Sequence, residues 1–196
     1  GPQPHLIVCD RTVGGEFENI VTPEKEIPER PMSIPWETCT TVGERFSFHY
    51  TDHFKTGRQL VHLLLNVVSR GGNLALNVAP QPDGALPAPV ASLRDLGRWM
   101  RIHGEGIYNT TIAEPYFIRN IRYTAKGDTR YIFYLYEDCA SLPLKLHLRF
   151  PGKAHHIRLM RTGQEVPFEE KSGELLLDTS AIDRNTAFYA DCFVVN

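Results

Sequence analysis

The chain lacks several features that identify whole classes of protein. Its four cysteines lie far apart and form no C-x-x-C pair, so they leave the cellular compartment open. The longest apolar run, residues 60–68, is interrupted by polar residues and is far shorter than the ~20 residues of a membrane-spanning helix. A net charge of −2 over 196 residues is close to neutral, so nothing indicates binding to nucleic acid or to an anionic membrane. The first residues contain no charged leader and no long apolar core, so we predict no signal peptide in this chain.

Three short apolar segments in the first half of the chain run into polar or charged residues. These are residues 5–9 before Asp10 and Arg11, residues 32–36 before Glu37, and residues 73–79 before Pro80 and the turn at 83–84. Barrels of eight parallel strands carry their active sites at the C-terminal ends of those strands and take about 200 residues or more. Three strands before the pattern changes therefore predict the last part of such a barrel.

Helical patterns follow the second and third of these segments. Thr56 is a favourable N-cap residue, and apolar residues within 60–68 surround most of the predicted helix, which the glycine pair at 71–72 ends. A second helix is predicted from Pro89 to Gly104, with an apolar stripe along one side. Strands that alternate with helices of this length are typical of α/β proteins.

The pattern changes to period two from about Pro115 onward. We predict strands at 131–136, 144–150, 157–160, 175–177 and 188–195, separated by turns that contain glycine. Short strands at this spacing, without helices, predict an antiparallel β-sandwich.

The predicted fold class is therefore α/β plus all-β. Residues 1–112 are predicted to form the C-terminal strands and helices of an incomplete (β/α)8-type catalytic barrel. Residues 113–196 are predicted to form a separate antiparallel β-sandwich domain.

Two glutamates lie where a glycosidase would need a carboxyl group. Such enzymes use a pair of carboxyl groups, ~5–5.5 Å apart for retention of configuration or ~6.5–9.5 Å apart for inversion. Glu37 follows the segment 32–36, and Glu24 lies in the long loop after Asp10. A solvated loop charge is the simpler explanation of either glutamate. A position at the end of a strand favours a catalytic role. The residues themselves leave both explanations open.

Arg11 and a pair of histidines also have two explanations each. Arg11 could bind a sugar hydroxyl or a carboxylate, or it could pair with Asp10 at the rim of the barrel. His49 and His53, with Asp52 between them, have a spacing that could hold a metal ion on a helix. Their segment is predicted to be a loop and has no second ligand cluster, so we predict no metal site.

The same residues carry a resemblance to a known family. The stretches that match are CDR at 9–11, TPE at 22–24, PWETCTT at 35–41, FSFHY at 46–50, VVSRGGNLALNVAP at 67–80 and GEGIY at 104–108. Together and in this order they resemble glycoside hydrolase family 29, the α-L-fucosidases. The resemblance covers residues 5–110, and the C-terminal strands resemble the domain that follows the barrel in this family only in kind.

This resemblance implies a retaining hydrolase that removes α-linked L-fucose from glycans without a metal or a cofactor. It implies an aspartate nucleophile and a general acid/base, for which Glu24 and Glu37 both match the family. It also implies that Arg11 contacts the sugar, together with the aromatic residues Trp36 and Phe48. Phe48 stands where many members of the family carry tryptophan.

The resemblance also implies that the chain is incomplete. The nucleophile aspartate belongs to earlier strands of the barrel and has no counterpart here, so we expect the chain alone to be inactive. Expected partners are a fucosylated glycan and either the missing N-terminal part of the barrel or further copies in a homo-oligomer, and the expected location is secreted or periplasmic. One alternative is a glycosidase of related architecture that acts on another sugar. The other is a non-catalytic carbohydrate-binding or structural domain, which exposed aromatic residues on the sandwich would support; the candidates are Tyr116, Tyr123, Tyr134 and Tyr136.

Overall fold

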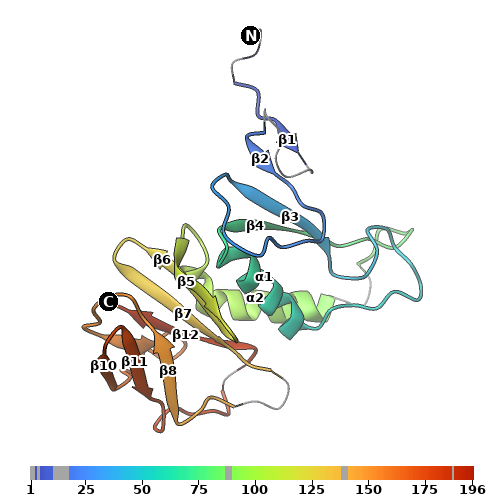
Figure 1. The fold of residues 1–196 in the computed structure, drawn as a ribbon. Helices are drawn as coiled ribbons and strands as arrows, with labels where there is room; N and C mark the ends of the chain where they lie inside the picture. Colours follow the sequence, from blue (N-terminus) through green and yellow to red (C-terminus); the bar gives the residue numbers. More distant parts are fainter. Residues whose placement is uncertain (1–2, 4, 11–17, 87–89, 138–140, 187) are drawn as a thin grey trace.

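The computed structural model describes residues 3, 5–10, 18–86, 90–137, 141–186 and 188–196. Along them, a small parallel sheet with two helices is followed by two antiparallel sheets. Figure 1 shows the helices α1 (Gly57–Val68) and α2 (Val90–His103) between the parallel sheet and the antiparallel sheets. No helix in the described part is long and apolar enough to cross a membrane.

The parallel sheet has four strands that lie in chain order. They are β1 (Cys9–Asp10), β2 (Ile20–Val21), β3 (Trp36–Thr41) and β4 (Gly72–Asn77). β3 and β4 are in register along their whole length, so their C-terminal ends lie side by side. All four strands run in the same direction, and their C-terminal ends therefore share one edge.

The predicted strand at 5–9 is wrong over most of its length. Only Cys9 belongs to β1, and the preceding Leu6 and Ile7 are 61% and 70% exposed. Within the described residues β1 is the edge of its sheet. An apolar run is buried on both faces only where other elements cover both faces, and here nothing in the described part covers residues 6–7.

The second predicted strand, at 32–36, is placed too early. β3 begins at Trp36, where the predicted strand ends, and continues through Glu37 to Thr41. The sequence WETCTT contains three threonines, whose β-branched side chains favour strands. Pro35, by contrast, cannot donate to a strand ladder. The third predicted strand, at 73–79, is confirmed in most of its length as β4.

Both predicted helices are confirmed. The Thr56 side chain accepts from the backbone N–H of Gln59, and the Gln59 side chain accepts from that of Thr56, which completes a capping box at the start of α1. Gly71, with a φ of 79°, turns the chain from α1 into β4. α2 ends at His103 and continues into the short 3-10 turn η1 (Gly104–Gly106).

The second half of the chain forms two antiparallel sheets. One has five strands in the order β5-β6-β7-β12-β9, and the other has three in the order β10-β11-β8. Their bounds are β5 Thr111–Ile118, β6 Ile121–Lys126, β7 Thr129–Leu135, β8 Lys145–Arg149, β9 Ile157–Leu159, β10 Phe168–Lys171, β11 Glu174–Asp178 and β12 Ala190–Val195. The predicted strands correspond to five of these, whereas β5, β6 and β10 were not predicted. The two sheets share one apolar core, which includes Ile132 and Phe193 from the first and Leu148 and Leu175 from the second.

The helices also join the two halves of the chain. A second apolar core unites Val61 and Leu65 of α1 and Trp99 of α2 with Phe133 and Val194 of the five-stranded sheet. The indole Nε1 of Trp99 donates to the backbone oxygen of Ala190 at 2.9 Å. α1 and α2 are therefore packed on both sides, against the parallel sheet and against the antiparallel one.

Candidate active site at the C-terminal edge of the parallel sheet

Glu24 lies just beyond the end of β2, at the shared C-terminal edge. It forms an isolated parallel bridge with Cys39 in the middle of β3, and the backbone N–H of Lys25 donates to the Cys39 oxygen at 2.9 Å. Glu24 itself is exposed. The backbone at Glu24 is therefore fixed by the neighbouring strand, while its side chain stays accessible.

Glu37 lies inside β3 and does not follow its end, so the predicted strand-end position of Glu37 is wrong. It is the second residue of the strand and pairs with Asn73 near the start of β4. Thr41, which ends β3, is four positions further on, or about 13 Å at ~3.3 Å per residue. Trp36, Thr38 and Thr40 are buried whereas Glu37 and Cys39 are half-buried, so the glutamate lies on the face of β3 away from the core.

Trp36 is a core residue in this structure. It is 1% exposed, packs with Val21 and Val67, and donates from Nε1 to the backbone oxygen of Arg70 at 3.0 Å. Its ring lies so close to Gly72 that a Cβ there would come within 2.3 Å of it. The ring therefore has no exposed face for a sugar, and what the tryptophan does here is to fix β3 against β4 and α1.

The loop 42–56, which follows β3, is fastened to the same edge by polar contacts to backbone groups. Lys55 donates from Nζ to the backbone oxygens of Thr41 (2.7 Å) and Gly43 (3.1 Å), and Asp52 accepts from the backbone N–H of Glu44 at 2.9 Å. That hydrogen bond lowers the pKa of Asp52 below its usual range. Burial, and then the nearby charge of Lys25, lower the pKa of Lys55.

Aromatic residues of this loop lie next to the Glu24 segment. Lys25 donates from Nζ to the backbone oxygen of Glu44 at 2.6 Å, and its Nζ lies 4.7 Å from the centre of the Phe46 ring. Phe48 is half-buried and meets Tyr50 edge-on, with ring centres 4.9 Å apart. Tyr50 is 85% exposed. The edge thus brings Phe46 next to the segment of Glu24, and Phe48 lies further along the same loop, whereas Arg11 lies outside the described residues.

Sequence reasoning missed the residues that hold the loop 42–56 in place. Lys55 and Asp52 act on backbone groups, and Asn77 at the end of β4 donates to the Phe46 oxygen at 2.9 Å. The one available signal was that Asn77 lies near the end of the strand predicted at 73–79. His49 accepts from Thr51, and in the described part no three His, Cys, Asp or Glu side chains could together hold a metal ion.

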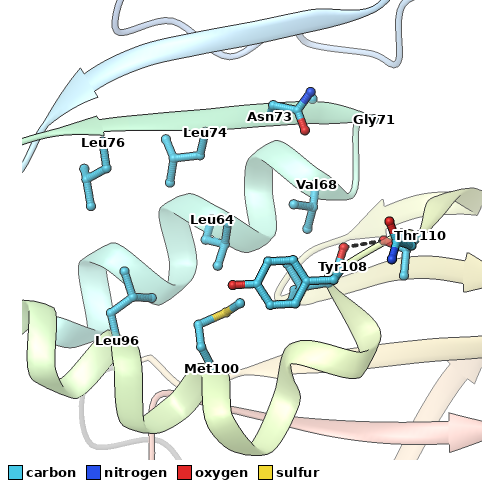
Figure 2. Close-up of a pocket in the computed structure, with 13 residues that line it drawn as sticks. Leu64, Val68, Gly71, Asn73, Leu74, Leu76, Leu96, Met100, Tyr108 and Thr110 are labelled. Atoms are coloured by element: carbon cyan, nitrogen blue, oxygen red, sulfur yellow. Dashed lines mark hydrogen bonds between the residues drawn. The ribbon is translucent and has the colours of Figure 1, made fainter.

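A hollow lined mainly by apolar side chains lies beside β4. It has a volume of about 580 Å³ and is bounded by β4, both helices and the segment after η1. Figure 2 shows the apolar side chains that enter it, which include Leu64, Leu74, Leu76, Leu96, Met100 and Tyr108. Within the described residues β4 pairs only with β3, so its other side is open next to this hollow.

The tyrosines that would support a carbohydrate-binding sandwich do not form an exposed row. Tyr123 and Tyr136 are 2% and 7% exposed and belong to the shared core of the antiparallel sheets, and Tyr134 packs against that core. Tyr136 donates from its hydroxyl to Asp191, which is itself buried. These residues are part of the packing of the second half of the chain.

Solved glycosidase structures share this fold. The α-fucosidase of Thermotoga maritima aligns with a TM-score of 0.78 at 26% identity, covering 100% of this chain and 46% of its own. α-L-Fucosidase isoenzyme 1 of Paenibacillus thiaminolyticus aligns with a TM-score of 0.79 at 25% identity, covering 92% of this chain and 45% of its own. One structure of the Thermotoga protein is a complex with fucose. The chain is thus of the glycoside hydrolase class.

The sequence narrows this class to one family. The profile of the α-L-fucosidase family matches residues 1–105, more than half of the chain. Plasma α-L-fucosidase of Rattus norvegicus is 36% identical over 89 residues, and tissue α-L-fucosidase of Macaca fascicularis is 32% identical over 119 residues. The aligned residues are 42% and 55% of this chain but only 19% and 25% of those relatives. This chain belongs to the α-L-fucosidase family.

Proposed function

We propose that the protein to which this chain belongs hydrolyses α-linked L-fucose from glycans with retention of configuration. The observation that carries the proposal is the position of Glu24 within the region that matches the family. A carboxyl group at the C-terminal edge of parallel strands is where barrel enzymes hold their catalytic groups. The substrate would be a fucosylated glycan or oligosaccharide.

In the proposed reaction Glu24 is the general acid/base. It first protonates the glycosidic oxygen as an aspartate, supplied from outside this chain, attacks the anomeric carbon and forms a covalent fucosyl-enzyme. Glu24, now ionised, then takes a proton from water, and the resulting hydroxide releases fucose and regenerates the aspartate. Retention requires the two carboxyl groups to lie ~5–5.5 Å apart across the sugar.

Two observations favour Glu24 over Glu37 for this role. Glu24 follows the end of its strand, whereas Glu37 lies four positions before the end of β3. The bridge to Cys39 fixes the backbone at Glu24 while the side chain is exposed. In this proposal Glu37 lies on the same side of the sheet as Glu24 but further from the C-terminal edge. Arg11 and Phe48 contact the sugar.

The proposal includes a closed barrel that this chain only partly supplies. The open side of β4 and the apolar hollow beside it are the surfaces on which a further strand and helix would pack. The solved relatives have more than twice the aligned length. In this proposal the four parallel strands end the barrel, residues 113–196 form the sandwich domain, and the chain is inactive until the rest of the barrel is present.

The test separates the two glutamates in the longer parent protein. Glu24→Ala and Glu37→Ala are assayed with an aryl α-L-fucoside, with and without azide. Loss of the acid/base lowers kcat by roughly 10²–10⁴-fold, and azide restores turnover by attacking the fucosyl-enzyme without general-base help. We expect this pattern for Glu24→Ala only. Full activity in both variants would refute the assignment.

A further inference from the structure

A second surface, remote from Glu24 in the sequence, combines arginines with two aromatic rings. Arg98, Arg101 and Ile102 of α2 line a hollow of about 550 Å³ together with Phe188 and Tyr189, which precede β12. Two neighbouring hollows, of about 330 and 220 Å³, also include Tyr189 and are both lined by Arg58 of α1. We call this region the Tyr189 surface.

Tyr189 is held rigidly at the centre of this surface. Its backbone has a φ of 64°, a left-handed conformation that is a rare outlier for a bulky residue. Its hydroxyl donates to Asp95 Oδ2 at 2.8 Å, and its backbone oxygen accepts from Tyr136 N–H at 3.0 Å and lies 2.9 Å from His62 Nε2. The Phe188 ring meets it edge-on at 5.1 Å. The Tyr189 ring is thus fixed before any ligand arrives, and the Phe188 ring packs against it.

The charge of the Tyr189 surface is positive in a chain whose net charge is −2. Four arginines and no aspartate or glutamate are among the described residues that line the three hollows. Asp95, which lies beside the hollows, pairs with Arg98 and also accepts from Tyr189. Arg184 donates to the backbone oxygens of 142, 179 and 182. Arg101 is exposed, and no described residue pairs with it.

We propose that the Tyr189 surface is an accessory site for an anionic saccharide, one that carries a sulfate or a carboxylate. The guanidinium group of Arg101 can donate two parallel N–H bonds to a pair of oxygens, which a carboxylate and a sulfate both present. The rings of Phe188 and Tyr189 offer apolar π-faces on which the C–H groups of a sugar ring pack. The choice of a saccharide, over an acidic peptide, rests on the proposed function. The expectation that the site binds an anion does not rest on the proposed function.

The experiment measures binding to this chain directly, without any hydrolysis. Isothermal titration compares a sulfated fucose oligosaccharide, the same oligosaccharide after desulfation, a uronic-acid oligosaccharide and an oligo-glutamate peptide. We expect the sulfated or the carboxylated saccharide to bind, and whichever binds identifies the anion. Arg101→Ala is expected to weaken that binding about tenfold, the loss typical of one charge-assisted hydrogen bond. Phe188→Ala should weaken it as well.

Arg94→Ala is the matched control, because Arg94 is also exposed on α2 but lines none of the three hollows. It should leave binding unchanged, and both arginine variants should keep the unfolding midpoint of the original chain. Equal binding of the desulfated sugar, equal loss in Arg94→Ala, or tighter binding of the peptide would each overturn the proposal. Because no turnover is measured, such a failure would leave the role of Glu24 untouched.

Discussion

The last strands of the two halves, β4 and β12, differ in how completely they are covered. All six residues of β12 are buried, between β7 on one side and β9 on the other. In β4 only Gly72 is buried, and within the described residues the strand pairs on one side alone. The five-stranded sheet is therefore covered on both faces, by the three-stranded sheet and by α1 and α2, whereas the parallel half relies on α1, α2 and, in our proposal, on further strands.

The largest test of this difference is a matched pair of core truncations. Phe193→Ala in β12 removes a ring that is 0% exposed and should lower the free energy of unfolding by about 3–5 kcal/mol. Leu74→Ala in β4 removes a half-buried side chain and should cost about 1 kcal/mol or less. Urea unfolding followed by circular dichroism measures both. Equal losses would show that the two strands are covered alike.

A second test concerns the joint between the halves, where His103 stacks on Trp99 at 4.5 Å. Burial lowers the pKa of His103 from 6.5 to about 4. The unfolded chain therefore takes up a proton at higher pH than the folded chain, and stability falls as the pH drops from about 6.5 to about 4. The loss amounts to roughly 3 kcal/mol. In His103→Phe this part of the pH dependence should be absent from unfolding curves, and a loss as steep as in the original chain would contradict the assignment.

The smallest test compares two glycines of the parallel half. In Gly72→Ala the new Cβ would press on the Trp36 ring, which should cost about 1–3 kcal/mol. Gly97 in α2 has open space around it, so Gly97→Ala should instead stabilise the chain by up to about 1 kcal/mol. Thermal unfolding measures both changes, which should be a lower Tm in Gly72→Ala and a higher Tm in Gly97→Ala. A neutral Gly72→Ala would mean that Trp36 can move, and that the parallel sheet is packed more loosely than the structure has it.

The sequence predicted best the features that depend on near neighbours. The N-cap at Thr56, the turn from α1 at Gly71 and most of the period-two strands were confirmed, since each needs only a few residues in a row. β5 was missed because Pro115 and a shift of register between Ile112 and Phe117 interrupt its alternation. β3 was misplaced because its threonines look polar in sequence and yet are buried.

The site was harder to predict because it depends on distant contacts. Glu24 lies at the edge through its bridge with Cys39, and Lys55 acts through the oxygens of Thr41 and Gly43. The partners in these contacts lie too far apart in the sequence for a short sequence motif to contain both. Trp36 was assigned to the sugar through the family resemblance. It adjoins Glu37 in sequence, yet neighbours along a strand point to opposite faces, and the tryptophan faces the core.

The most direct measurement is the hydrolysis of an aryl α-L-fucoside by this chain alone, alongside the longer parent protein. Circular dichroism would first establish that the chain is folded. If the acid/base is here and the nucleophile is not, the parent protein turns over the substrate and the chain alone gives none above the buffer rate. Sustained turnover by the chain alone, abolished in Glu24→Ala, would contradict the account, because the nucleophile would then have to lie within these 196 residues.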